Sequence, residues 1–192
     1  MKKTIAVLSL CVAIMMLAVP VTIAEEEKSS TELKHDSQRA KINEVAKETH
    51  DQLFNEHPKA KGLYDDAVGW AVFDNTKVAF GISGGGGTGV AVSKTSGKHV
   101  YMKMGTGGIG FGIGVNKFQV VFLFQDEKTL QNFVEKGWQA DAGATATAAK
   151  EAAEVKTNFV NGLAIYQHTE KGLMLNADLS GTKYWLHDKL NE

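Results

Sequence analysis

Apolar residues recur at helical spacing near the start of the chain and at two-residue spacing further along it. One face of a helix expected over about 31–56 carries Ile42, Val45, Ala46, Thr49 and Leu53. Ser29 and Glu32 have the form of a capping box at the start of this helix. Pro58 predicts a short second helix through Tyr64, because proline suits the first turn of a helix.

From Gly69 onward the apolar period changes to two, which is typical of strands. We expect strands at 70–73, 78–83, 89–93, 99–104, 109–116 and 118–124. Turn-forming residues separate them at 74–75, 84–87, 95–97 and 105–108. Short connections between successive strands favour antiparallel hairpins over parallel crossovers.

A third helix is expected after these strands. Asp126 would cap it, Leu130, Phe133 and Val134 would face inward, and Gly137 would end it. The segment 138–149 alternates alanine with small or polar residues and is compatible with strand or helix, and two further strands are expected at 163–168 and 173–179. The predicted fold class is therefore α+β: a mainly antiparallel, strongly curved, glycine-rich sheet with an N-terminal helix pair and one helix after the central strands.

The N-terminal residues have the pattern of a secretory signal peptide. Lys2 and Lys3 precede an apolar stretch over 5–19, and Thr22 and Ala24 place small residues before the acidic run 25–27. We expect 1–24 to be a cleaved signal peptide, 25–31 a flexible leader, and 32–192 one domain in a periplasmic or secreted protein. The alternative is an uncleaved anchor, although the apolar stretch is short against the roughly 20 residues of a spanning helix.

Charge limits the partners that this chain could bind. Its formal net charge is −1, and removal of Lys2 and Lys3 would make it −3. A dedicated nucleic-acid-binding protein is usually strongly basic, so the composition argues against nucleic acid. Arg39 is the only arginine, and contacts with anions would therefore depend on lysines. The only cysteine, Cys11, would leave with the signal peptide.

Glycine alternates with large apolar residues in the strand expected over 109–116. From 108 to 114 every second residue is glycine, namely Gly108, Gly110, Gly112 and Gly114. A strand places them all on one face, where another backbone, a helix or a ligand chain can approach closely. One interpretation is a tightly coiled sheet or barrel corner; the other is an acyl-chain groove or a membrane-facing surface.

Candidate catalytic, metal and cofactor motifs do not form a recognisable site. Spacing would let His50 and His57 share a helix face, but without a cysteine or H-E-x-x-H partner we expect both at the surface. Ser180, His187 and Asp188 are the residue types of a hydrolase triad, yet sequence neighbours rarely form one and no nucleophile elbow is present. The glycines 105, 107 and 110 match a dinucleotide fingerprint only formally, because they precede a strand. We therefore predict no catalytic residues, no metal, no cofactor and a non-enzymatic protein.

Several segments together resemble a known family. Residues 69–73 read Gly-Trp-Ala-Val-Phe, Lys77 and a glycine-rich segment follow, and the order continues through 109–114, 122–124, 126–137, 140–142 and 172–174. This order is similar to that of the SYLF-domain, or lipid-binding YSC84-like, family over about 33–190. Asp74 stands where the family usually has proline, and Gly112 where glutamine is common. The second change removes a polar side chain that could have lined a pocket.

The resemblance implies a function and supplies no catalytic residues. Phospholipid or phosphoinositide binding is described for eukaryotic members, which also contact actin, and exported bacterial members look like envelope lipid-binding proteins. We thus expect a non-enzymatic phospholipid- or membrane-binding protein of the bacterial cell envelope. The alternative is an envelope structural or protein-interaction module that uses the glycine-rich sheet face to bind a protein partner.

Lipid binding needs lysines for head groups beside apolar surface for hydrocarbon contact. The candidates lie in or near the predicted strand turns: Lys77, Lys94, Lys98, Lys103, Lys117, Trp70, Tyr101 and Phe118. Any single lysine of this set could instead solubilise a loop or protect an edge strand.

Overall fold

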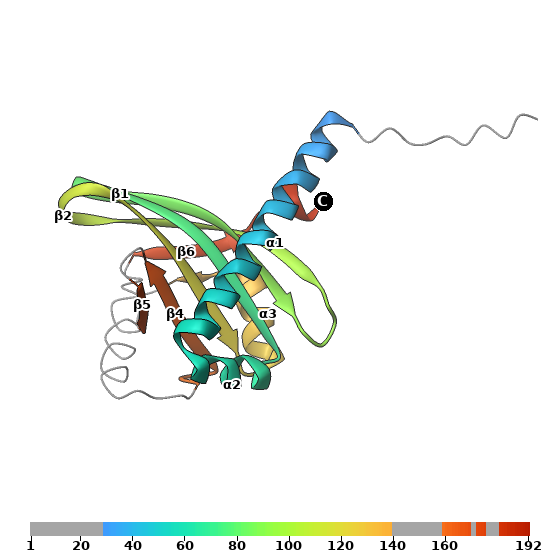
Figure 1. Cartoon of the computed structure of the whole chain (residues 1–192). Coiled ribbons are helices and arrows are strands. Elements are labelled where there is room, and N and C mark those ends of the chain that lie inside the picture. The colour runs from blue at the N-terminus through green and yellow to red at the C-terminus, as the bar shows by residue number, and fades with distance from the viewer. Residues whose placement is uncertain (1–28, 140–158, 170–171, 176–180) are drawn as a thin grey trace, which may run out of the picture.

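The computed structural model describes residues 29–139, 159–169, 172–175 and 181–192 (Figure 1). The predicted signal peptide and most of the predicted leader lie outside these residues. So do 140–149 of the segment whose pattern is compatible with strand or helix, and 176–179 of the last predicted strand. The fold below is that of the described part.

Both predicted N-terminal helices are confirmed. Helix α1 spans Ser30–Glu56 and α2 spans Pro58–Asp66. The Ser29 hydroxyl accepts a hydrogen bond of 3.2 Å from the Glu32 backbone N–H, as the capping pattern predicts. Pro58 stands at the first position of α2, where its missing N–H leaves no helical bond unmade.

Two very long strands form the centre of the sheet. Strand β1 spans Gly69–Ser93 and β2 spans His99–Phe124. They pair antiparallel from Gly69 opposite Phe124 to Val92 opposite His99, and the register shifts between Phe80 and Ile82. Of the four predicted separators, only 95–97 forms a turn; residues 74–75, 84–87 and 105–108 were wrongly expected to break the strands.

Close packing explains why the glycine run belongs to a strand. Strand β1 curls back over itself, so that its second half lies against its first (Figure 1). A Cβ on Gly89 would collide with the Val72 carbonyl and the Phe73 ring, and one on Gly85 would lie 2.9 Å from the Lys77 Cα. A Cβ on Gly87 would likewise collide with the backbone of 74–75. These glycines are therefore required for backbone-to-backbone contact, not for a turn.

The remaining strands pair along the other edge of β2. Strand β4 (Leu163–Thr169) pairs with 118–124 of β2, and β6 (Thr182–Leu186) pairs with 102–106. Strand β5 (Gly172–Leu175) extends the sheet beyond β4, and β3 (Trp138–Gln139) extends it beyond β6. The order is β3-β6-β2-β4-β5, with β1 on β2, and every pair is antiparallel. The sequence did not predict β6 or the short helix α5 (Asp188–Asn191).

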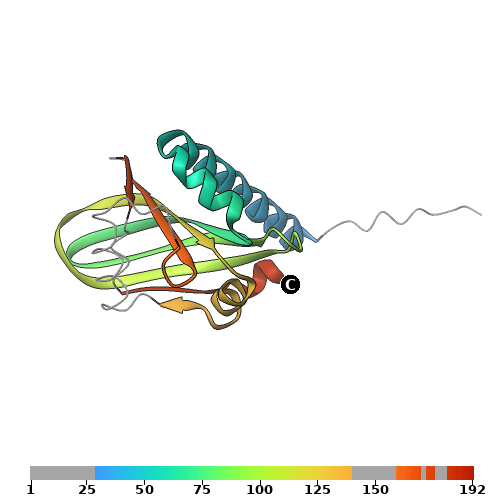
Figure 2. The ribbon, with the colours of Figure 1, turned by 90° about the horizontal axis from the view of Figure 1, so that it is seen from below.

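Helices cover the sheet on both sides (Figure 2). Helix α3 (Glu127–Lys136) begins after its cap Asp126 and ends at Gly137, which has a φ of 72°, and it buries Leu130 and Phe133 as predicted. The hydrophobic core cluster that α3 covers contains Phe73 of β1. The hydrophobic core cluster under α1 and α2 contains Val72 of the same strand. Adjacent β1 residues thus face different cores, as the two-residue period of a strand requires. The predicted α+β class with a strongly curved antiparallel sheet is confirmed.

Candidate functional site

The middle of the β1–β2 ribbon extends beyond the rest of the sheet. Strand β6 pairs with β2 as far as Thr106, and β4 pairs with it from Phe118. Among the strands that the structure describes, residues 107–117 of β2 pair only with β1. The ribbon reverses its direction in this stretch and projects from the body of the molecule (Figures 1 and 2).

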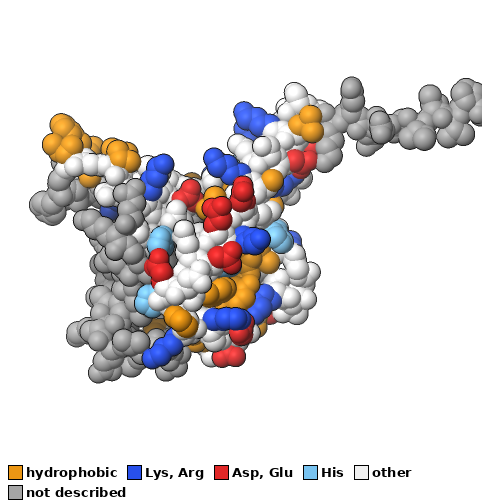
Figure 3. Space-filling view, in the orientation of Figure 1, with side chains coloured by type: hydrophobic (Ala, Val, Ile, Leu, Met, Phe, Trp, Pro, Cys, Tyr) orange, Lys and Arg blue, Asp and Glu red, His pale blue; other side chains and the backbone are white. Residues whose placement is uncertain are grey.

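Large apolar side chains stand exposed on this projection. Their exposed fractions are 50% for Val78, 73% for Phe80, 76% for Ile82, 82% for Ile113 and 63% for Val115. We call these five residues the apolar bend. Val78 lies opposite Val115 and Phe80 opposite Ile113, and directly opposed residues of antiparallel strands share a face. A space-filling view shows hydrophobic side chains gathered at this end of the ribbon (Figure 3).

The predicted glycine face belongs to the same projection. A Cβ on Gly114 would have no atom within 4 Å, and one on Gly108 would meet only the Ser83 hydroxyl oxygen, at 3.7 Å. Gly110 and Gly112 lie between them in β2. At Gly108 and Gly114 the described part of the molecule therefore places nothing in close contact, in contrast to Gly85 and Gly89.

The charge of the ribbon differs from that of the whole chain. From Gly69 to Phe124 the ribbon and its turn contain five lysines and one carboxylate, Asp74, although the chain as a whole has a formal net charge of −1. The five lysines are those predicted for lipid contact. The ribbon is therefore a continuous cationic element within a nearly neutral protein.

Only two of these lysines lie beside the apolar bend. Lys117 of β2 lies opposite Thr76, and Lys77 of β1 lies opposite Asn116, next to the pair of Val78 and Val115. Lys117 is exposed and Lys77 half-buried. The other three lie elsewhere: Lys103 faces β6 in mid-strand, and Lys94 and Lys98 lie at the hairpin turn between β1 and β2.

Lys94 has a structural role in the fold. Its Nζ donates hydrogen bonds to the Tyr64 and Asp65 carbonyl oxygens, at 2.8 and 3.1 Å, and lies 4.8 Å from the centre of the Tyr64 ring. These carbonyls belong to the last turn of α2, whose carbonyls need partners outside the helix. Lys94 thus fastens α2 to the end of β1.

The three aromatic residues proposed for lipid contact lie mainly in the core. Tyr101 and Phe118 are each only 8% exposed, and Trp70 is half-buried against the helix pair. The Tyr101 hydroxyl accepts a hydrogen bond of 3.1 Å from the Asn43 side-chain amide. The sequence therefore did not predict which apolar residues of the strands are exposed. The bend residues show the same two-residue alternation as true core strands, so local pattern alone could not identify them.

His50 is buried, contrary to the surface position expected for it. It is 7% exposed, and its ring contacts those of Phe54, Tyr64 and Trp70. Burial lowers the pKa of His50 from 6.5 to about 4, because a low-dielectric environment penalises the charged form, while Asp51 opposes this shift. His57 is half-buried at the C-terminal end of α1.

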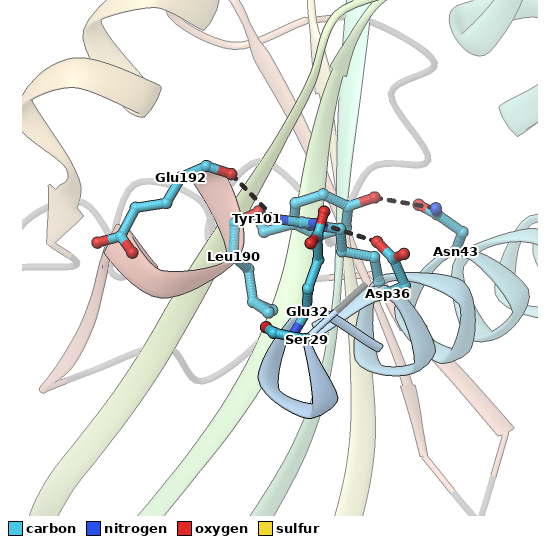
Figure 4. A network of polar contacts seen from close by, with 8 residues as sticks. Ser29, Glu32, Asp36, Asn43, Tyr101, Leu190 and Glu192 are labelled. Carbon is cyan, nitrogen blue, oxygen red and sulfur yellow. Dashed lines mark hydrogen bonds and ion pairs between the residues drawn. The ribbon is translucent and has the colours of Figure 1, made fainter. Parts of the chain in front are cut away.

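The single arginine binds the C-terminal end of the chain. The Nε of Arg39 donates to the Leu190 carbonyl at 2.9 Å, and its two terminal nitrogens donate to Asp36 and to the Glu192 carbonyl at 3.0 and 3.2 Å (Figure 4). The Asn191 side chain binds both the N–H and the carbonyl of Tyr101, at 2.9 and 2.7 Å. These contacts dock α5 between α1 and β2.

Other candidate chemistry in the described part is limited. No group of three or more metal-ligating side chains occurs within the residues that the structure describes. Ser180 of the formal triad lies outside these residues. Burial is the main cause that lowers the pKa of His187, and the positive charge of Lys103 is the second. Over the described ranges, no helix is long and apolar enough to cross a membrane.

Two comparisons with known proteins bear on this site. Residues 105–192 match the family model "Ysc84: Las17-binding protein actin regulator". The chain is also 45% identical over 154 residues to Beta cell expansion factor A of Aeromonas veronii. That alignment covers 80% of this chain and 59% of the relative, so it spans about three fifths of the relative's length. Residues 107–117 of the projection lie within the family match.

Proposed function

From the match of residues 105–192 to the Ysc84 family, also called SYLF, we propose that this chain is a member of that family and a non-enzymatic protein that binds phospholipid membrane surfaces. The observation that supports the proposal is the cationic β1–β2 ribbon with its exposed apolar bend. Anionic head groups attract lysines, and apolar side chains gain free energy when they leave water for the acyl region. The two requirements for surface binding therefore lie on one element.

Attraction to the membrane must be local. The whole chain has a formal net charge of −1, so its long-range field cannot favour an anionic surface. The ribbon can, because its five lysines outnumber its one carboxylate, Asp74. Each lysine close to an anionic bilayer contributes about 1 kcal/mol, an effect that fades beyond the Debye length of about 10 Å at 0.1 M salt.

Co-sedimentation with vesicles tests this function. The purified chain would be mixed with vesicles of phosphatidylcholine alone or of phosphatidylcholine and phosphatidylglycerol in equal parts, at low and high salt. We expect sedimentation with the anionic vesicles that weakens as salt rises, since salt screens exposed charges. Absence of sedimentation with either vesicle, together with absence of lipid in an organic extract of the protein, would contradict the proposal.

We further propose that the protein acts in the cell envelope or outside the cell. The support is the signal-peptide pattern of residues 1–24. The intact mass of the protein recovered from periplasm and medium tests this: the proposal requires the mass of residues 25–192. Recovery only in the cytoplasm at full-length mass would contradict it.

A second candidate function is a protein-interaction module of the envelope. The observation in its favour is the same exposed apolar surface, because contiguous exposed apolar patches mark protein-binding sites as well as membrane-binding ones. The description of the matched family also names a protein partner, Las17. Binding to a defined partner that persists at high salt, without any binding to vesicles, would favour this function over the first.

A further inference from the structure

We propose that the apolar bend is the membrane-inserting element of this protein and enters the boundary between head groups and acyl chains of an anionic bilayer. The inference rests on the phospholipid-binding function proposed above and assigns the contact to particular residues. It concerns Val78, Phe80, Ile82, Ile113 and Val115, none of which was among the residues predicted from sequence to contact lipid.

The geometry of the projection presents these side chains to a flat surface. Residues 107–117 of β2 extend beyond the pairing with β4 and β6, so the bend stands clear of the described sheet. Phe80 and Ile113 lie directly opposite each other and are 73% and 82% exposed. A ribbon of two strands is narrow, and the glycines at 108 and 114 add no side-chain bulk. A bilayer can therefore accommodate the bend with little displacement of lipid.

The charges beside the bend match an anionic surface. Lys117 lies two residues from Val115 on the same face of β2, on the side of the bend toward the body of the protein, whereas Lys77 precedes Val78 and points to the opposite face of the ribbon. When the bend enters the acyl boundary, a lysine at the position of Lys117 reaches the head groups while its apolar stem stays near the hydrocarbon. The exposed carboxylate of Asp74, opposite Gln119, lies on the body side of Lys117, so Lys117 is the charged side chain nearest the bend on this face.

Backbone chemistry limits how deep the bend can go. Within the described strands, the outer edges of the ribbon at 107–117 have no pairing strand, so part of their N–H and C=O groups depend on water or head groups. Leaving such groups unpaired in hydrocarbon costs several kcal/mol each, and the bend is therefore confined to the interface. Interfacial elements bury their apolar face by about 5–10 Å, a depth that a side-chain cluster on a bend can reach.

The charge beside the apolar bend argues against a second copy of the chain as the partner that covers it. A symmetric dimer through the apolar bend would use the same patch twice and bring Lys117 of both copies into one interface. Like charges brought together in this way disfavour association. An anionic bilayer satisfies both the apolar and the cationic part of the surface.

Environment-sensitive labels on single cysteines test the inference in the full chain. A Cys11→Ser background removes the native thiol, and Ile113→Cys places a nitrobenzoxadiazole label at the bend. Leu33→Cys is the matched control, because Leu33 is an exposed apolar residue on α1, 56% exposed. Both proteins would be mixed with the phosphatidylcholine–phosphatidylglycerol vesicles, with and without lipids that carry a spin label high on the acyl chain.

We expect a blue-shifted emission and quenching by the spin label at position 113 and neither change at position 33. We also expect that Phe80→Ser with Ile113→Ser weakens vesicle binding by roughly tenfold or more, because two large apolar side chains no longer enter the bilayer. Leu33→Ser should leave binding unchanged. Far-UV circular dichroism of the variants checks that the exposed substitutions have not altered the fold.

Each alternative result has a distinct meaning. Vesicle binding with an unshifted label at position 113 would overturn the insertion of the bend while leaving the phospholipid-binding function in place. Absence of vesicle binding by the unmodified chain would overturn both. A Phe80→Ser, Ile113→Ser protein that binds vesicles normally but loses a concentration-dependent dimer in analytical ultracentrifugation would identify the bend as a self-association surface and also overturn the inference.

Discussion

The imidazole of His50 meets the indole of Trp70 edge to face, with ring centroids 4.5 Å apart and ring planes at 86°. His50 lies in α1 and Trp70 at the start of β1, so this contact joins the helix pair to the sheet. Phe54 and Tyr64 complete the ring cluster. Within the described part, the buried Nε2 of His50 has no hydrogen-bond partner. The neutral ring is thus part of an aromatic core, and its protonation would place a charge there.

Acid should destabilise the fold through His50. Its pKa is about 4 in the folded protein against 6.5 for an ordinary histidine. Because the unfolded state binds the proton more readily, the stability that depends on neutral His50 is present above pH 6.5 and is lost as pH falls toward 4. The loss over this window is about 3 kcal/mol at most. Urea denaturation between pH 7 and pH 4 measures it.

The matched comparison uses two histidines near the same helix end. His50→Leu should flatten the fall in unfolding free energy between pH 6.5 and pH 4, while His57→Gln should leave it in place, since His57 is only half-buried. An equally steep fall in the His50→Leu protein would show that other groups govern acid sensitivity. The change of the unfolding free energy with pH is the quantity to compare. Its absolute value at neutral pH is not, because the substitution also alters packing there.

Gly89→Ala should destabilise the protein by about 3 kcal/mol or more. Its new methyl group would collide with the Val72 carbonyl and the Phe73 ring, and backbone cannot move aside as a flexible side chain can. Gly114→Ala is the strand-matched control, with no atom within 4 Å of the added methyl, and should change stability by less than about 1 kcal/mol. Thermal and urea denaturation report both values. Equal effects at the two positions would contradict the curled packing of β1.

Arg39→Lys should loosen the C-terminal helix. A lysine has a single nitrogen and cannot reproduce three bonds that diverge from one planar guanidinium toward Asp36, Leu190 and Glu192. We expect a loss of about 1–2 kcal/mol in unfolding free energy. Hydrogen exchange over 187–192 should accelerate before global unfolding. Lys41→Ala on the exposed face of α1 provides the control, and unchanged protection of α5 in Arg39→Lys would argue against the docking role.

Charge reversal near the bend should weaken membrane binding more than reversal at the hairpin turn. Lys117→Glu removes one attraction and adds one repulsion, about 2 kcal/mol in total, which corresponds to roughly thirtyfold in affinity for anionic vesicles. Lys98→Glu, at the turn between β1 and β2, should have a clearly smaller effect. Co-sedimentation at fixed salt measures both. A larger effect at Lys98 would indicate that the membrane contact lies at the turn between β1 and β2.

Local signals in the sequence were sufficient for the helix ends and for the fold class. Ser29, Pro58, Asp126 and Gly137 each act on backbone groups within about one turn of themselves, and the structure has the helix boundaries where they predict. The two-residue apolar period identified strands in the same way. The predicted turn at 95–97 joins β1 to β2 as an antiparallel pair, as its shortness indicates, whereas the other three predicted connections lie within strands.

Only the tertiary structure determines how far the strands extend and which of their side chains are exposed. Glycines 84–87 have the composition of a turn, and they remain in β1 because residues 74–77 pack directly on this stretch. His50 is buried by rings that α2 and β1 bring to it. Phe80 and Phe118 both sit in strands with the same alternation, yet one is 73% exposed and the other 8%, because Phe118 belongs to the core cluster that contains Phe133 of α3, whereas Phe80 belongs to neither described core cluster. A sequence pattern records which residues share a face; only the packing of distant segments decides whether that face is covered.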